Sequence, residues 1–497
     1  MFPRDRTRRP LGHTIVHVGL AISLAFGSLA AAAGYWGVVM APELVRSPND
    51  PAVIAASRTV PRGQIVDRDG TVLARNERDA NGEVYRVYAD RAISHVVGYA
   101  SRQFGTAGLE RSYSAELAGL AVDPVADALR KFGSDPYDPQ DLQLSLSLEL
   151  QQAAMAALGE RRGAVVMLDP TTGEVYALAS APTYNASLIA DPVTAADSFR
   201  RLQRHSAEPL LPRATLGRYV PGSVFKIVTA VAALGSGAIT PETTFPRQAE
   251  AGADGLLVQG FRIREGHSLR RGEALDLVEA TEVSSNIYYA LAGLETGGAE
   301  LVAFAERLGF GEPIPFDLPT APSQVTNARG SEPGGFIDDV ELANAAYGQG
   351  ETFVTPLQMA LVAATVANDG VLMRPRLVTA LTGKRGTRSI GPDELRRVIS
   401  ARDAQAIQAA MQAAVEGELG RQFTSGAKVQ GVRTAGKSGT AELGGQGEPH
   451  SWFVGFAPVE QPRVAIAVVV EQAGRGGAVA APLGGDLMER FFELFPE

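Results

Sequence analysis

The chain has 497 residues, 45% of them hydrophobic and 20% charged, which is enough for two to four domains with a large buried core. It has no cysteine, and its six histidines lack the spacing of metal ligands, so disulfides and thiol catalysis are excluded and we predict no metal or other cofactor. The formal net charge of −9 argues against nucleic acid as a partner.

The first predicted element is an apolar run at residues 15–40, which is long enough to cross a bilayer. Arginines precede it, and basic flanks stay in the cytoplasm, so we predict a cytoplasmic tail at residues 1–14. A cleaved secretory signal is the alternative, because LAAAAG at residues 29–34 offers small residues to a signal peptidase. The aromatic residues that follow suit a membrane interface and favour an uncleaved, single-pass anchor in the cell membrane, with the rest of the chain extracytoplasmic.

Residues 41–145 are predicted to be non-catalytic. Residues 41–60 contain three prolines and are predicted to be a juxtamembrane spacer that lifts the rest of the chain off the membrane. Residues 61–145 mix short strand-like runs, such as EVYRVYA, with turns, and no group of reactive side chains stands out among them. We therefore predict a small pedestal module at residues 61–145, followed by one large domain at residues 146–497.

The large domain shows strand patterns at both ends and helix patterns in the middle. Two runs of β-forming residues, Ala164–Leu168 and Glu174–Ala179, flank the turn DPTTG and predict a hairpin. Further helices are predicted at Ala274–Leu294, Glu300–Leu308, Pro356–Asn368 and around Leu487–Leu494, and further strands at Arg433–Ala441, Trp452–Ala457 and Arg463–Glu471. This order predicts an α/β (α+β) domain, with an antiparallel sheet flanked by helices.

The stretch YVPGSVFKIVTAVAALGSG, residues 219–237, predicts a buried helix with a serine and a lysine near its start. Ser223 and Lys226 are three residues apart and would lie on one helix face. Burial disfavours a charged lysine and lowers its pKa. A neutral lysine amine could then act as the base for the neighbouring serine hydroxyl, which would be the nucleophile. The alternative is that Lys226 extends to the surface and Ser223 only caps the helix. The chain has another S-x-x-K match at Ser425–Lys428, so this motif alone is weak.

Two further short motifs make the pattern specific. TEVSSNIYYA contains Ser284 and Asn286 in an S-x-N arrangement, and RTAGKSGTAEL contains Lys-Ser-Gly-Thr at residues 437–440. S-x-x-K, S-x-N and K-T-G, in this order, resemble the signature of penicillin-binding proteins and class A β-lactamases. Here a serine replaces the threonine of K-T-G, which keeps the hydroxyl group.

The flanking stretches narrow the resemblance to one family. RGQIVDRDGTVLA, GLERSYSAELAG, GQGETFVTPLQMA and HSWFVGFAP resemble the class B penicillin-binding proteins, the monofunctional peptidoglycan D,D-transpeptidases, and most of all the small actinobacterial type. The resemblance covers nearly everything after residue 60. It implies a penicillin-binding transpeptidase domain of the serine β-lactamase-like fold at residues 146–497. It also implies an acyl-enzyme formed from stem peptides that end in D-alanyl-D-alanine, and covalent inhibition by β-lactam antibiotics.

The resemblance also implies roles for the motif residues. Ser223 would attack the penultimate D-alanine carbonyl, and Lys226, held neutral by burial and by the nearby positive Lys437, would accept its proton. Ser284 would pass a proton to the departing D-alanine. Asn286 would hold the lysine and the substrate amide.

The third motif would bind the substrate. Lys437 would supply positive charge near the terminal carboxylate, which the hydroxyls of Ser438 and Thr440 would bind. Gly439 has no side chain, so a peptide substrate could lie along that strand edge. The backbone N–H groups of Ser223 and Thr440 would form the oxyanion hole.

Other functions remain open at the level of the sequence. A D,D-carboxypeptidase, a β-lactamase, a β-lactam sensor, or a scaffold that activates a membrane glycosyltransferase of the shape or division type through the pedestal could use the same motifs. Class A β-lactamases hold a water on the glutamate of an E-x-x-x-N element between the second and third motifs. That spacing is absent here, because Glu341 to Asn344 is one residue short and Glu282 pairs only with Asn286 of the second motif.

Overall fold

The structure is a computed structural model that describes residues 11–36, 61–119, 138–445 and 447–496. Its N-terminal helix α1 (Leu11–Gly34) begins inside the predicted tail. Among the described residues it is the single helix that is long and apolar enough to cross a membrane, with a span of 20 residues, Ile15–Gly34, that is not buried by the protein. Residues 1–10, the end of the predicted anchor and the predicted spacer at 41–60 lie outside the described residues.

The large domain is built around a five-stranded antiparallel sheet with the order β15-β16-β17-β7-β8. Its strands are β7 (Gly163–Leu168), β8 (Val175–Ala181), β15 (Ala435–Ala441), β16 (His450–Ala457) and β17 (Val464–Val470). The first two form the predicted hairpin, and the other three are the strands predicted near the C-terminus. The two ends of the domain therefore meet in one sheet, as predicted, and β15 lies at an edge of it.

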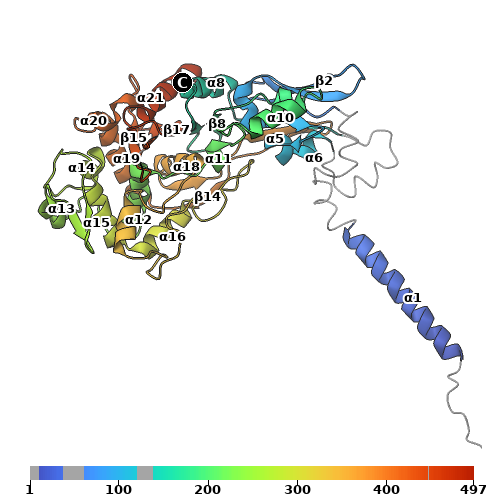
Figure 1. Ribbon diagram of the computed structural model, residues 1–497, viewed down its shortest axis with the longest axis horizontal. Coiled ribbons are helices and arrows are strands. Elements are labelled where there is room, and N and C mark those ends of the chain that lie inside the picture. Colours follow the sequence, from blue (N-terminus) through green and yellow to red (C-terminus); the bar gives the residue numbers. More distant parts are fainter. Residues whose placement is uncertain (1–10, 37–60, 120–137, 446, 497) are drawn as a thin grey trace, which may run out of the picture.

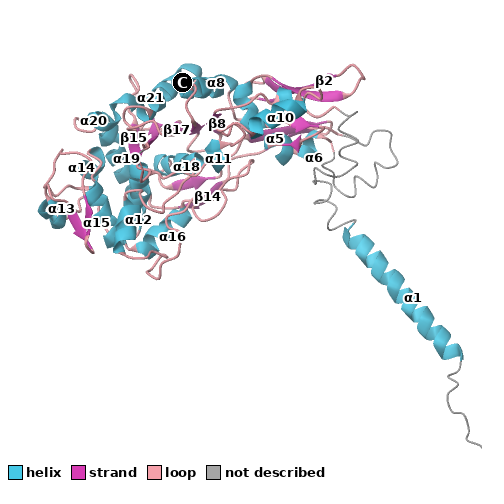
Figure 2. Cartoon of the chain, viewed as in Figure 1, coloured by secondary structure: helices cyan, strands magenta, loops and turns pink. Residues whose placement is uncertain are grey.

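Both faces of this sheet are apolar, and helices cover each of them (Figures 1 and 2). On β17, Val468 packs with helices α8 (Leu148–Leu158) and α21 (Ala480–Leu494), whereas the next residue, Val469, belongs to the core on the other side. This is the two-residue period of a strand that is buried on both faces. Helix α18 (Pro356–Ala367), in which every residue is buried, crosses the second face. The predicted α+β architecture is confirmed.

The predicted helix at Ala274–Leu294 is wrong as a single element. The structure has α14 (Leu277–Glu282) and α15 (Asn286–Thr296), separated by a three-residue break. The second helix starts anew because Ser285 caps it, accepting a hydrogen bond from the N–H of Tyr288. The S-x-N motif lies at this break, so the position of the break determines how the side chains of Ser284 and Asn286 are oriented.

The other helices of the large domain surround the sheet and the break. They are α9 (Ser187–Ala190), α10 (Ala195–Gln203), α11 (Arg213–Leu216), the 3-10 helix η3 (Gly222–Phe225), α12 (Lys226–Gly235), α13 (Pro246–Ala251), α16 (Gly298–Arg307), α17 (Asp339–Ala346), α19 (Ala401–Glu416), α20 (Arg421–Thr424) and the 3-10 helix η4 (Ser425–Ala427). Two short hairpins accompany them, β9 (Leu256–Val258) with β10 (Phe261–Ile263) and β11 (Val371–Met373) with β14 (Glu394–Arg397).

The pedestal contains a six-stranded sheet with the order β13-β12-β6-β1-β2-β3. Its strands are β1 (Ile65–Val66), β2 (Val72–Arg78), β3 (Val84–Tyr88), β6 (Asp141–Leu144), β12 (Val378–Gly383) and β13 (Gly386–Ser389). Beside it lie η2 (Arg91–Ile93), α4 (Ser94–Val97), α5 (Gly108–Ser112), α6 (Ser114–Leu117) and the hairpin β4 (Ala100–Ser101) with β5 (Gly105–Thr106). Strands β12 and β13 come from residues far along the chain, and no local sequence pattern indicates that they pair with the pedestal.

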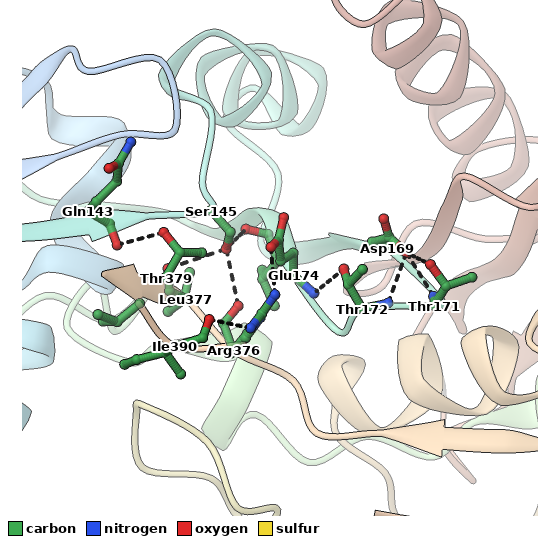
Figure 3. A network of polar contacts seen from close by, with 12 residues as sticks. Gln143, Ser145, Asp169, Thr171, Thr172, Glu174, Arg376, Leu377, Thr379 and Ile390 are labelled. Carbon is green, nitrogen blue, oxygen red and sulfur yellow. Dashed lines mark hydrogen bonds and ion pairs between the residues drawn. The ribbon is translucent and has the colours of Figure 1, made fainter. Parts of the chain in front are cut away.

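A polar network joins the two sheets where β6 ends (Figure 3). The Ser145 hydroxyl lies 2.9 Å from the carbonyl oxygen of Val175 in β8 and 3.1 Å from that of Arg376, which precedes β12. The Arg376 guanidinium forms an ion pair with Glu174 at 2.6 Å and donates to the carbonyl of Ile390 at 2.5 Å. Because the buried apolar residues on either side belong to one continuous core, pedestal and large domain are packed firmly together.

Candidate active site

The predicted nucleophile Ser223 lies in the 3-10 turn η3, at the entrance to helix α12. Gly222 has a φ of +57° and donates its N–H to the carbonyl of Gly348 at 2.9 Å. A Cβ on Gly222 would lie 2.7 Å from the carbonyl oxygen of Thr440, so no side chain fits there. Just before the turn, the indole N–H of Trp452 donates to the carbonyl of Val220 at 3.0 Å. The turn is held from both sides, and Ser223 is partly exposed.

Lys226 is completely buried one turn further on, which rules out the alternative that it extends to the surface. Its Nζ lies 2.7 Å from the carbonyl oxygen of Ser284, 3.1 Å from the Oγ of Ser284 and 2.8 Å from the Oδ1 of Asn286. Burial, followed by the charge of Lys437, lowers the pKa of Lys226 well below its usual range, while Glu265 acts in the opposite direction. No hydrogen bond joins Ser223 to Lys226 in the described structure; such catalytic contacts often tighten only when substrate binds.

The second motif lies at the break between α14 and α15. Ser284 has a φ of +58°, a left-handed conformation that non-glycine residues rarely adopt. This conformation turns both its carbonyl and its hydroxyl toward Lys226. Asn286, the first residue of α15, accepts from Lys226 through Oδ1 and donates from Nδ2 to the carbonyl of Arg264 at 3.0 Å. The sequence predicted that these residues meet, but not that a strained backbone brings them together.

Residues 264–267 form a short segment, here called the strap, that contacts Ser285 and Asn286 of the second motif. The sequence did not predict its part in the site. Its Glu265 carboxylate accepts from the Ser285 hydroxyl at 2.5 Å and from the backbone N–H of Asn286 at 2.6 Å. Its His267 ring packs against Phe423, with ring centroids 4.7 Å apart. The strap follows the short strand β10 without a periodic pattern of its own, so nothing in the sequence marks it as part of the site.

The third motif lies on the edge strand β15. Lys437 is buried, which lowers the pKa of its amine to about 7, and its Nζ donates to the carbonyl of Ser438 at 2.9 Å. The Ser438 hydroxyl donates to the carbonyl of Phe423 at 3.0 Å. The Thr440 hydroxyl accepts from the N–H of Gly476 at 3.2 Å, which leaves its own hydrogen for a ligand.

Gly439 serves packing in a way that the sequence did not indicate. A Cβ at this position would lie 2.9 Å from the carbonyl oxygen of Pro221 and 3.0 Å from a methyl carbon of Val224. The missing side chain therefore allows β15 to approach the turn that carries Ser223. The sequence predicts this glycine from contact with substrate, and the structure adds a second reason, because the nucleophile turn leaves no room for a side chain here.

These elements enclose a cleft of about 730 Å³. Of the predicted site residues, Ser223, Ser284, Asn286, Ser438 and Thr440 line it. Lys226 and Lys437 are buried behind this lining. The cleft wall also includes Arg264, Glu265, His267, Asn344, Tyr347, Gln349, Phe423, Glu442 and Arg475. Three motifs that are separated by about 60 and 150 residues in the chain thus meet in one cavity.

Two competing residues lie elsewhere. Lys428 of the second S-x-x-K match is half-exposed and forms an ion pair with Glu416 at 2.7 Å, so it is not a buried base. Glu282 accepts from the N–H groups of Leu419 and Gly420 at 3.0 and 3.3 Å and does not line the cleft. Within the part of the chain that the structure describes, no group of three or more His, Asp or Glu residues could hold a metal ion.

Comparison with known proteins agrees with this geometry. Residues 163–489 match the family described as penicillin binding protein transpeptidase domain, and residues 62–134 match the penicillin binding protein A dimerisation domain. The peptidoglycan D,D-transpeptidase PbpA of Mycolicibacterium smegmatis is 35% identical over 94% of this chain and 96% of its own length. PbpA of Mycobacterium tuberculosis is 33% identical over 91% of this chain and 93% of its own length.

Solved structures agree as well. The imipenem acyl-enzyme complex of penicillin-binding protein A from M. tuberculosis has a TM-score of 0.76 and 31% identity, and covers 87% of this chain and 99% of that one. Its ceftriaxone acyl-enzyme complex has a TM-score of 0.75 and 30% identity, with 88% and 99% covered. The match to the family model spans more than half of the chain. The chain therefore belongs to the penicillin-binding protein transpeptidase family and is a peptidoglycan D,D-transpeptidase.

Proposed function

We propose that Ser223 is the nucleophile and Lys226 the general base of this D,D-transpeptidase. One observation carries the proposal: Nζ of the fully buried Lys226 is bonded to both Ser284 and Asn286, directly behind the turn that presents Ser223 to the cleft. Burial and Lys437 both disfavour the charged form of a lysine in this position and lower its pKa, so its neutral form is favoured. Its lone pair can then accept the hydroxyl proton of Ser223.

The surroundings of Lys226 suit the charge that forms during acylation. When Ser223 attacks the penultimate D-alanine carbonyl, an O–C bond forms and Lys226 becomes an ammonium with three N–H bonds. The two oxygens of Ser284 and the Oδ1 of Asn286 provide three acceptors for them. As the peptide C–N bond breaks, the Ser284 hydroxyl, 3.1 Å from Nζ, relays the proton to the departing D-alanine amine.

Strand β15 would bind the other end of the substrate. A Cβ on Gly222 would contact the Thr440 carbonyl, so this carbonyl points toward the nucleophile turn. In an antiparallel strand the N–H and C=O of one residue point to the same side, so the Thr440 N–H also points there. With the N–H of Ser223 it forms the oxyanion hole, where one donor contributes about a hundredfold to a thousandfold in rate. The Thr440 hydroxyl and the charge of Lys437 anchor the terminal carboxylate, and the Ser438 hydroxyl joins them when it rotates away from the Phe423 carbonyl.

The second half-reaction links two stem peptides. An amine from a neighbouring stem peptide attacks the Ser223 ester, forms the cross-link and releases the serine. A β-lactam presents a similar amide with a nearby carboxylate, and relatives of this chain form acyl-enzymes with imipenem and ceftriaxone. We therefore also propose that β-lactam antibiotics acylate Ser223.

The N-terminal part would place this chemistry outside the cell. Helix α1 serves as a single-pass, uncleaved anchor, with residues 1–14 in the cytoplasm and the pedestal and transpeptidase domains outside it. The predicted boundaries at residues 61–145 and 146–497 remain part of this proposal. The pedestal is the region that would contact a membrane glycosyltransferase of the shape or division type, so that glycan synthesis and cross-linking occur together.

Transfer to an amine is the direct test of this function. The full-length chain in detergent would receive a thioester analogue of an acyl-D-alanyl-D-alanine peptide, with a D-amino acid as acceptor. We expect release of the leaving group and formation of the transfer product, and loss of both in Ser223→Ala. The matched control Ser425→Ala should keep both. Release without transfer, at any acceptor concentration, would indicate a carboxypeptidase and contradict the proposal.

A further inference from the structure

The strap at residues 264–267 binds Asn286 of the second motif at two points, its backbone N–H and its side-chain amide. The carboxylate of Glu265 accepts the backbone N–H of Asn286 at 2.6 Å, and the carbonyl of Arg264 accepts its side-chain Nδ2 at 3.0 Å. With Nδ2 committed in this way, Oδ1 is the end of the amide that faces Lys226 at 2.8 Å. The strap therefore fixes the orientation of the amide as well as its position.

The same carboxylate satisfies the start of helix α15. Besides the N–H of Asn286, Glu265 accepts from the Ser285 hydroxyl at 2.5 Å and from the N–H of Ile287 at 3.4 Å. The first N–H groups of a helix have no partner within it, and a negative charge there is favoured by the helix dipole. These contacts hold the break in which Ser284 keeps its left-handed backbone.

The charge of Glu265 also reaches the catalytic lysine. Lys437 on β15 opposes protonation of Lys226, and Glu265 is the group that favours it. Two other groups face the pair: His267 on the strap, whose pKa is lowered mainly by burial, and the Tyr289 ring, whose centroid is 5.7 Å from Nζ. Lys226 therefore lies under two opposing charges, that of Lys437 and that of Glu265.

We propose that Glu265 is a positioning residue for acyl transfer, because its carboxylate holds Asn286 and the Ser284 turn against Lys226 and its charge offsets that of Lys437. This proposal rests on the proposed roles of Lys226 and Asn286. It assigns the strap a function in catalysis rather than only in shaping the cleft wall. The two parts of the proposal have separate consequences. The contacts of Glu265 affect the maximal rate of acylation, and its charge affects how that rate depends on pH.

The test is the rate of acylation of the full-length chain by a fluorescent penicillin, measured from pH 5.5 to 9. Glu265→Gln should lower the plateau rate about tenfold or more, because two N–H donors and a hydroxyl lose a charged acceptor. In the plot of rate against pH, the fall in rate on the acid side is the acidic limb. Glu265→Gln should move this limb to lower pH, because without Glu265 the neutral form of Lys226 persists further into acid. Glu265→Asp keeps the charge but shortens the reach, so the limb should return to the wild-type position at an intermediate rate.

Controls make each outcome decisive. Glu279→Gln removes a carboxylate from helix α14, outside the cleft lining, where it pairs with Arg270 at 2.7 Å, so the pH profile of this variant should match that of wild type. The proposal is overturned if Glu265→Gln keeps the wild-type plateau and limb, if its plateau falls while the limb stays, or if only the lifetime of the adduct changes. Thermal unfolding is followed in parallel, and should Glu265→Gln not fold, a wild-type plateau in Glu265→Asp overturns the proposal. Label that persists in Ser223→Ala would instead refute the proposed function.

Discussion

Two regions of this protein bury charged side chains, and they do so in opposite ways. In the pedestal, Glu110 is fully buried between Arg62 and Arg86, with N–O distances of 2.8 and 2.6 Å. In the cleft, Lys226 and Lys437 are buried near each other, and each donates only to uncharged oxygens. Opposite charges are paired in the first region, and like charges are brought together in the second.

The difference appears in the protonation of each group. Burial alone would raise the pKa of Glu110, but Arg86 and then Arg62 outweigh it, so the pKa is lowered and the group stays charged. Burial lowers the pKa of Lys226 well below its usual range and that of Lys437 to about 7. We therefore expect the paired cluster around Glu110 to stabilise the folded state. We expect the two buried lysines of the cleft to favour a neutral, reactive amine at a cost in stability. The predictions below test this contrast.

The largest expected effect is on acylation when the proposed base, Lys226, is removed. Lys226→Ala removes the proposed base, so acylation by penicillin should fall by about a hundredfold to ten-thousandfold. Stopped-flow or gel-based labelling of the full-length chain measures this rate. Circular dichroism should show that the variant is folded, since the change removes one side chain from the site. A folded variant that acylates within a factor of about three of wild type would mean that another group takes the proton.

In the pedestal we expect a loss of stability without a loss of chemistry. Glu110→Gln leaves two buried guanidinium groups without a charged partner, which should lower the free energy of unfolding by about 3 to 5 kcal/mol. Denaturant titration measures this change. Penicillin should still acylate the folded fraction at the wild-type rate, because Glu110 lies outside the cleft.

The matched control for that prediction is Glu77→Gln. Glu77 is in the same module and pairs with Arg75 at 2.8 Å, but both side chains are largely exposed. Removing its charge should cost less than about 1 kcal/mol. Equal losses for Glu77→Gln and Glu110→Gln would show that the buried cluster has no special role in stability.

The Glu110 cluster also predicts how stability changes in acid. Because its folded pKa lies below the ordinary value of 4.5, the carboxylate contributes stability fully above that pH. This contribution is lost as pH falls through the lower folded pKa. The difference in unfolding free energy between wild type and Glu110→Gln should therefore be constant near neutral pH and shrink in acid. A difference that grows as pH falls would contradict the assignment of a lowered pKa.

One expected change in stability has the opposite sign. Lys437→Met should abolish acylation and yet raise the free energy of unfolding by about 1 to 3 kcal/mol at neutral pH, because it removes a buried, poorly paired charge. The folded pKa, about 7, is lower than the ordinary 10.5, so the folded state binds fewer protons between these values and wild-type stability rises with pH there. The gain in the variant should shrink from pH 7 toward pH 10. A variant less stable than wild type at pH 7 would count against this account.

The sequence predicted residues that meet at one cleft because their motifs are short and local. Ser223 in η3 and Lys226 at the start of α12 are three residues apart, about one helical turn, and this spacing is visible in the sequence. The sheet was predictable for a similar reason, since strands such as β17 consist of continuous β-branched and small apolar residues. Local patterns therefore gave the fold class and the three motifs.

What the sequence did not reveal depends on contacts between distant segments. Glu265 is one of many acidic residues until the strap folds over α15, 20 residues further along the chain. Residues 378–389 look like an ordinary hairpin, and only the structure pairs them with β6 of the pedestal. The left-handed backbone of Ser284 had no sequence signal either, because a serine rarely adopts it. These features arise from tertiary packing, which no local pattern records.

The central claim is that Ser223, partly exposed in the cleft, carries the acyl group and gives its proton to the buried amine of Lys226. Its most direct test is to react the full-length chain with penicillin and locate the adduct by mass spectrometry of peptides. We predict one penicilloyl group, attached to Ser223 and persisting for minutes or longer, because the sequence between the second and third motifs lacks the E-x-x-x-N element that holds the hydrolytic water of class A β-lactamases. An adduct on Ser425, or clearance of a large molar excess of penicillin within seconds, would contradict this account.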